Sequence, residues 1–146
     1  MSRVLLNRVF AKDTFKVTAS VVSTGWLAGQ LFSLNSLGEA ALAVTDAALF
    51  VGVDMPAEVS APPTGSQLTG VYGIGTKLYI DHSVEVAAGS SSRAYNTTCE
   101  SGTMSADLYV DSSGKFTTSV TGSVKAKLIQ VPSAANNYTL GVILRV

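Results

Sequence analysis

The sequence predicts a mainly β protein with little helix. Apolar and polar residues alternate along three stretches, residues 14–21, 77–87 and 106–120, and this alternation is the pattern of a strand with one buried face. Gly, Asn, Asp, Ser and Pro separate the alternating stretches, as turn residues do between strands. The length of 146 residues favours one domain, or one domain plus an arm.

The clearest element is a β-hairpin over residues 108–118. Leu108 and Val110 lie on one face of its first strand, and Asp-Ser-Ser-Gly at 111–114 supplies the turn, because Asp or Ser can bond the local backbone and Gly accepts a positive φ. The second strand, residues 115–120, continues the alternation. The hairpin holds no residue type typical of catalysis, so we expect the function to lie in surfaces.

Residues 1–13 are interpreted as an extended N-terminal arm and residues 14–146 as the β-rich domain. The arm combines positive charge with apolar side chains, and such a segment can add to an exposed sheet edge of a partner. The alternative is an ordinary first strand within the domain. The predicted partner contacts in this segment are Arg3, Val4, Leu5, Leu6, Arg8, Phe10 and Lys12.

Between the arm and residue 53 the pattern predicts strands joined by short connections. The expected elements are a strand at 14–21, a loop at 23–29, a hairpin of strands 31–34 and 40–44, a short helical turn at 45–48 and a buried strand at 49–53. Residues 40–50 form the only window that competes as a helix.

A proline-rich loop follows at residues 55–65. It contains Pro56, Pro62 and Pro63, and it cannot lie inside a sheet because proline lacks the N–H donor. Prolines also reduce the entropy lost when a loop becomes ordered. We therefore add these three prolines to the predicted partner contacts.

The second half of the chain continues as strands and turns. The expected elements are a turn at 73–75, a strand at 77–87, a weaker strand at 93–99, the hairpin above, a strand at 123–131 with a bulge near 128–129, a turn at 132–137 and a closing strand at 138–146.

Composition limits the possible partners. Charged residues make up 14% of the chain and the net charge is zero, so the chain lacks the basic surface that nucleic-acid binding requires. It also lacks an apolar stretch long enough for a membrane span. A surface of small neutral residues suits a protein covered by a partner or by copies of itself; a monomer with Ser- and Thr-rich strands is the alternative.

The sequence offers little for catalysis or metal binding. Its one histidine, His82, falls on the apolar face of a predicted strand, where the adjacent Asp81 points to the opposite face. The one cysteine, Cys99, excludes an intrachain disulfide and favours synthesis in a reducing, intracellular compartment. We expect no enzymatic activity, no cofactor and no metal.

A set of weak motifs from Gly29 onward carries a resemblance. The motifs are Gly-Gln-Leu-Phe-Ser-Leu at 29–34, the apolar run 47–53, the proline-rich loop, Tyr-Val-Asp at 109–111 with Gly-Lys at 114–115, Ser-Ala-Ala at 133–135 and the apolar 141–144. In this order they resemble the small capsid decoration (cement) proteins of tailed bacteriophages. The chain departs from that pattern in its polar residues 93–101 and in its zero rather than acidic net charge.

The resemblance implies a β-tulip or small β-barrel domain. It also implies a homotrimer that sits on the capsid surface of a virion and clamps neighbouring subunits of the major capsid protein, after synthesis in the host cytoplasm. No catalytic residues carry over. Two alternatives remain: a tail-tube, fibre or other head–tail structural subunit, and a small β-barrel ligand-binding module whose pocket Trp26, Tyr72 and Tyr79 would line.

Overall fold

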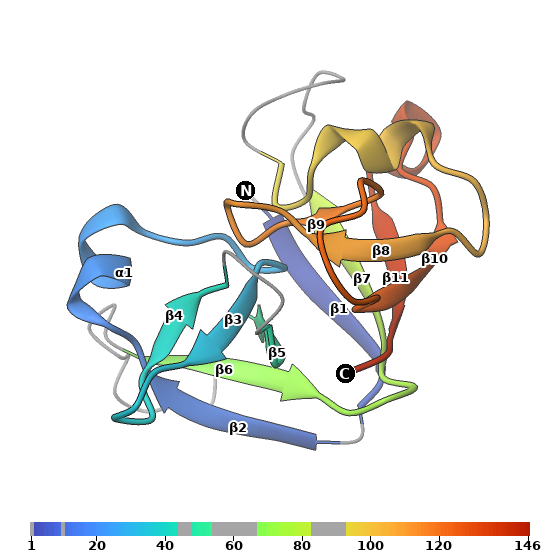
Figure 1. Ribbon diagram of the computed structural model, residues 1–146. Coiled ribbons are helices and arrows are strands. Elements are labelled where there is room, and N and C mark those ends of the chain that lie inside the picture. The colour runs from blue at the N-terminus through green and yellow to red at the C-terminus, as the bar shows by residue number, and fades with distance from the viewer. Residues whose placement is uncertain (1, 10, 44–47, 54–66, 83–92) are drawn as a thin grey trace.

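The computed structural model describes residues 2–9, 11–43, 48–53, 67–82 and 93–146. Two antiparallel sheets occupy the two halves of the molecule (Figure 1). The mainly β prediction is therefore confirmed. Among the described strands both sheets have edge strands and neither closes into a barrel, so of the β-tulip or small β-barrel domain that the resemblance implied, the structure shows a small β-rich domain.

The larger sheet, sheet A, has six strands in the described part of the chain. Their order is β1 (Ser2–Arg8), β7 (Lys77–His82), β11 (Leu140–Leu144), β10 (Ala126–Gln130), β8 (Asp107–Val110) and β9 (Phe116–Thr117). The predicted closing strand is central, because β11 pairs with both β7 and β10. The register of β10 shifts between Leu128 and Gln130, where the sequence predicted a bulge.

The smaller sheet, sheet B, contains five strands among the described residues. Their order is β2 (Ala11–Lys16), β6 (Gln67–Tyr72), β5 (Phe50–Val53), β3 (Leu31–Leu34) and β4 (Ala40–Leu42). The predicted β3–β4 hairpin and the buried strand β5 are thus present. The helix α1 (Ala19–Thr24) lies next to β4. Most of the expected helical turn at 45–48 falls outside the described residues.

The N-terminal segment forms an edge strand in each sheet. β1 pairs with β7 of sheet A, and β2 pairs with β6 of sheet B. Apart from Val9, the described residues of the segment interpreted as an arm thus lie in strands of the domain, as in the alternative interpretation. β2 also continues across the expected boundary at residues 13 and 14.

The strand expected at 14–21 ends early. β2 stops at Lys16, and Thr18 begins α1 by accepting a hydrogen bond from the Val21 amide through its hydroxyl, at 3.3 Å. Val17 and Val21 are both buried. Their spacing of four residues fits a helix face as well as a strand face, so the alternation was ambiguous here.

Two further strand predictions are wrong in part. The strand expected at 93–99 is irregular and leads into the 3₁₀ helix η1 (Thr97–Ser101), because the Asn96 side chain accepts a hydrogen bond from the Thr98 amide. The second strand of the hairpin, expected at 115–120, is shorter than predicted. It is β9, which ends at Thr117, and Val120 is 77% exposed. The turn at 132–137 contains the short η2 (Ala134–Asn136). The strand expected at 77–87 is described only up to His82.

The main core lies between the two sheets. One face of sheet B, which carries Leu31, Val51 and Val71, belongs to one buried cluster with side chains of sheet A such as Leu78 and Leu128. We call this face of sheet B the inner face. Its aliphatic residues alternate with those of the opposite face, as strand geometry requires.

A second cluster lies on the opposite, outer face of sheet B. Phe32, Phe50 and Leu68 are buried there together with Val17 and Val21 of the α1 region. The outer face therefore receives its cover from α1 and the segment before it, rather than from sheet A.

Candidate functional site

A row of aromatic rings crosses the outer face of sheet B. Phe15 stacks on Phe50 with ring centroids 4.3 Å apart, and Phe50 stacks on Phe32 at 5.9 Å. Trp26 closes the row by meeting Phe32 edge to face at 5.5 Å. Stacked and T-shaped pairs of this kind are favourable geometries for aromatic rings. The row links β2, β5 and β3 across the sheet.

Two glycines make room for this row. Gly52 of β5 and Gly70 of β6 are direct partners in the sheet. A Cβ on Gly70 would lie 2.4 Å from a ring carbon of Phe50, and a Cβ on Gly52 would lie 2.6 Å from a ring carbon of Phe32. The glycine pair therefore lets the rings lie directly on the backbone, a role that glycine often has within strands.

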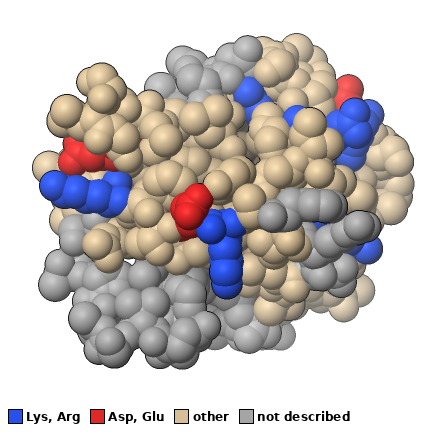
Figure 2. Space-filling view, turned by 90° about the horizontal axis from the view of Figure 1, so that it is seen from below, with Lys and Arg blue, Asp and Glu red and all other residues tan. Residues whose placement is uncertain are grey.

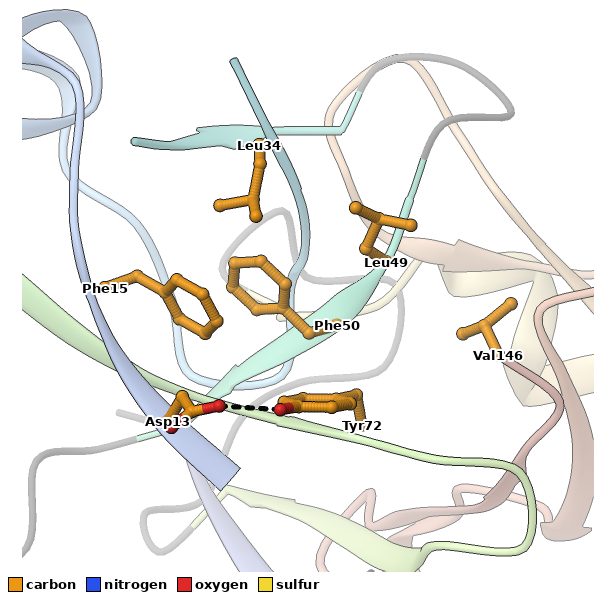
Figure 3. Close-up of a pocket in the computed structure, with 7 residues that line it drawn as sticks. All are labelled: Asp13, Phe15, Leu34, Leu49, Phe50, Tyr72 and Val146. Carbon is orange, nitrogen blue, oxygen red and sulfur yellow. Dashed lines mark hydrogen bonds between the residues drawn. The ribbon is translucent and has the colours of Figure 1, made fainter. Parts of the chain in front are cut away.

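A hollow opens beside Phe15 and Phe50 on the same face (Figure 3). Its volume is about 430 Å³. The lining residues are Asp13, Phe15, Leu34, Leu49, Phe50, Tyr72 and Val146. Leu34 is 40% exposed and Leu49 is 51% exposed, so the hollow presents apolar side chains to solvent.

The polar end of the hollow is a hydrogen bond between two side chains. The Tyr72 hydroxyl donates to Oδ2 of Asp13 at 2.6 Å. This hydrogen bond, with smaller effects of burial and of the Asp13 charge, raises the pKa of Tyr72 above its usual value. The hollow thus combines an apolar wall with one oriented carboxylate, the arrangement that small-molecule sites favour.

The pocket predicted from Trp26, Tyr72 and Tyr79 is not assembled. Tyr72 lines the hollow, whereas Trp26 packs on Phe32 at the far end of the row. Tyr79 lies in β7 of sheet A, opposite Gly141. Sequence analysis missed the other lining residues; the signal that could have found them is a glycine inside each of two strands, at positions 52 and 70.

The candidate contacts of the N-terminal segment divide between core and surface. Val4 is half-buried and packs against the main core, while Leu5 and Leu6 are 44% and 42% exposed. Lys12 is exposed in β2. Arg3 and Arg8 belong to β1, but their side chains lie outside the described residues, as do Phe10, Pro56, Pro62 and Pro63.

The polar residues 93–101 serve packing rather than a site. The buried Arg93 guanidinium lies 3.3 Å from Oε2 of Glu100 and 4.1 Å from the centre of the Tyr138 ring. The Tyr95 hydroxyl donates to the Tyr138 carbonyl at 2.8 Å. Arg93 and Tyr95 thus attach this segment to the loop before β11.

Cys99 is a buried thiol. Its Sγ donates to the Phe116 carbonyl at 3.4 Å, and burial raises the pKa of Cys99 to about 12. A thiol in this state is a poor nucleophile at neutral pH. Cys99 is therefore part of the main core.

The described residues lack both a group of metal-ligating side chains and a membrane-spanning helix. No three His, Cys, Asp or Glu side chains in that part of the chain are grouped so as to hold a metal ion. The helices formed by the described residues lack the length and apolarity needed to cross a bilayer.

Neutral side chains dominate the described part of one face of the molecule (Figure 2). On the face seen in Figure 2, charged side chains form a few small groups separated by wide neutral areas.

Comparison of the chain with protein-family models and with curated proteins finds no match.

Proposed function

We propose that this chain is a structural virion protein that binds the outer surface of a tailed-phage capsid, as a homotrimer, and stabilises contacts between major capsid subunits. The proposal rests first on the sequence resemblance to decoration proteins. The observation that supports it in the structure is the edge strand β1, where two neighbouring leucines are exposed.

β1 has the features of a partner-binding edge. Successive side chains of a strand point to opposite faces, so Leu5 and Leu6 present apolar groups on both faces, each more than 40% exposed. Among the described strands β1 pairs only with β7. A strand of a capsid subunit can add to such an edge through main-chain hydrogen bonds, while the leucines pack against its side chains.

Attachment of this kind relies on apolar burial. Each Å² of apolar surface removed from water contributes roughly 25 cal/mol before the costs of association. Salt screens charges but leaves apolar contacts intact. We therefore expect the protein to remain attached to capsids when salt rises to molar levels.

The direct test is co-sedimentation with capsid shells that lack the protein. The variant Leu5→Gln with Leu6→Gln should bind about tenfold or more weakly, because two apolar contacts are lost. Leu37→Gln is the matched control, since Leu37 is 80% exposed in the β3–β4 turn, away from β1. Equal binding of all three proteins, or release by moderate salt alone, would contradict the proposal.

Substitution is a better test than truncation. Deleting residues 1–13 would remove β1 and half of β2, so the loss of two strand pairings would obscure any loss of binding.

The alternative function, that of a tail-tube, fibre or other head–tail structural subunit, predicts a different assembly. Decoration proteins form closed trimers on a shell, whereas tube subunits form stacked rings or filaments. Electron microscopy of the purified protein and of its native particle distinguishes the two.

A further inference from the structure

The hollow on the outer face of sheet B has the size of a small-molecule site. Its volume of about 430 Å³ falls within the range of ligand pockets. Four strands of sheet B contribute to its wall (Figure 3): Phe15 comes from β2, Leu34 from β3, Phe50 from β5 and Tyr72 from β6. Because Phe15 and Phe50 stack on each other over Gly70, the wall is already formed without a ligand.

The charge in the hollow indicates the kind of ligand. Among the described lining residues, Asp13 is the one charged side chain. Tyr72 orients it by donating to Oδ2, and a carboxylate has acceptor capacity for further donors.

The geometry points to a binding site for arylalkylamines, small molecules that join an aromatic ring to an ammonium group. The ring of the ligand packs against Phe50, Leu34 and Leu49. The ammonium group donates to the Asp13 carboxylate at the polar end. This inference is independent of the proposed capsid function, because it uses sheet B and the capsid proposal uses β1 of sheet A.

The test compares three ligands of similar shape by amide chemical-shift titration of the intact protein. The ligands are 2-phenylethylamine, the neutral 2-phenylethanol and the anionic phenylacetate. We expect the amine to bind about three- to tenfold more tightly than the alcohol, the ratio that one hydrogen bond to a partly screened charge supplies. Phenylacetate should bind more weakly than the alcohol.

Variants assign the charge effect to one residue. Asp13→Asn should remove the preference for the amine over the alcohol. Glu39→Gln is the matched control: Glu39 pairs with Lys16 at 3.6 Å, does not line the hollow, and should leave the preference intact. Leu34→Gln should weaken all three ligands together, and thermal melts establish that each variant is folded.

Three results would overturn the inference. One is equal affinity of the wild-type protein for amine and alcohol. Another is a preference for the amine that survives Asp13→Asn in a folded variant. The third is the absence of any shift at residues lining the hollow at millimolar ligand.

Discussion

The two faces of sheet B come from the same strands and differ in almost every respect. The inner face is aliphatic, and its residues Leu31, Val51 and Val71 are fully buried against sheet A. The outer face is aromatic and lies over a pair of glycines. α1 and Trp26 cover one part of it, and the hollow lies beside another part.

If the hollow binds a ligand as we propose, one sheet uses its two faces for different purposes, the inner face for packing and the outer face for binding. Substitutions on the inner face should lower stability, because a close-packed interior is affected by the loss of even one methylene group. On the outer face, the rings near the hollow are held by stacking and by glycine, while Leu34 and Leu49 remain exposed at its rim. Substitutions on the two faces should therefore change the free energy of unfolding by different amounts.

The largest effect should come from a pair of leucines on one strand. Leu31 and Leu34 both belong to β3, but Leu31 is fully buried on the inner face and Leu34 is 40% exposed at the hollow. Leu31→Ala should lower the free energy of unfolding by about 2–5 kcal/mol. Leu34→Ala should lower it by about 0.5 kcal/mol or less. Urea denaturation measures both, and similar losses for the two variants would refute the distinction between the faces.

A smaller effect should follow from filling the glycine pair. In Gly70→Ala the new methyl group would lie 2.4 Å from the Phe50 ring, so the ring must move, at a cost of about 1–3 kcal/mol. Phe50→Leu removes the ring edge that clashes. The double variant should therefore be more stable than the sum of the two single changes implies. Additive losses in a double-mutant cycle would show that the ring does not rest on Gly70.

Alkaline pH should weaken the main core. Burial raises the pKa of Cys99 from 9.0 to about 12, so the folded state keeps the proton where the unfolded state loses it. This contribution to stability is complete below pH 9 and is lost as the pH rises toward 12. Burial also raises the pKa of Tyr95. Thermal melts between pH 8 and 11 should show a steeper decline for the wild-type protein than for Cys99→Ala; parallel curves would contradict the assignment.

The smallest effect concerns the polar end of the hollow. Tyr72 should titrate above its ordinary pKa of 10.0, because its hydroxyl donates to the Asp13 carboxylate. Asp13→Asn removes the negative charge and should bring the Tyr72 pKa down. Ultraviolet titration of the phenol at 295 nm, with Tyr72→Phe identifying the signal, measures the shift. An unchanged titration in Asp13→Asn would show that the hydrogen bond is weak in solution.

Local patterns predicted much of the fold. The Asp111 turn is an example: the Asp111 side chain accepts hydrogen bonds from the amides of Ser113 and Lys115, and Gly114 has a φ of 75°. The phase shift in β10 and the presence of the apolar closing strand β11 follow from periodicity and apolar content in the same way. Such features depend on neighbours in sequence, which a single sequence displays.

Contacts between distant segments could not be read in the same way. Alternation at 14–21 fits both the strand that ends at Lys16 and the helix that begins after Thr18, and the cap decides between them. The hollow brings together residues from positions 13 to 146. Its formation depends on the Gly52–Gly70 pairing, which is a property of the sheet register and not of either strand alone.

The central claim is that the outer face of sheet B binds ligands while the inner face only packs. Methyl-selective NMR spectra of the protein, recorded with and without 2-phenylethylamine, test it most directly because an aromatic ligand shifts the methyl groups that it contacts. The account predicts shifts at Leu34 and Leu49, which line the hollow, and none at Leu31 and Val71 of the inner face. Shifts of similar size at all four residues, or at none of them, would contradict it.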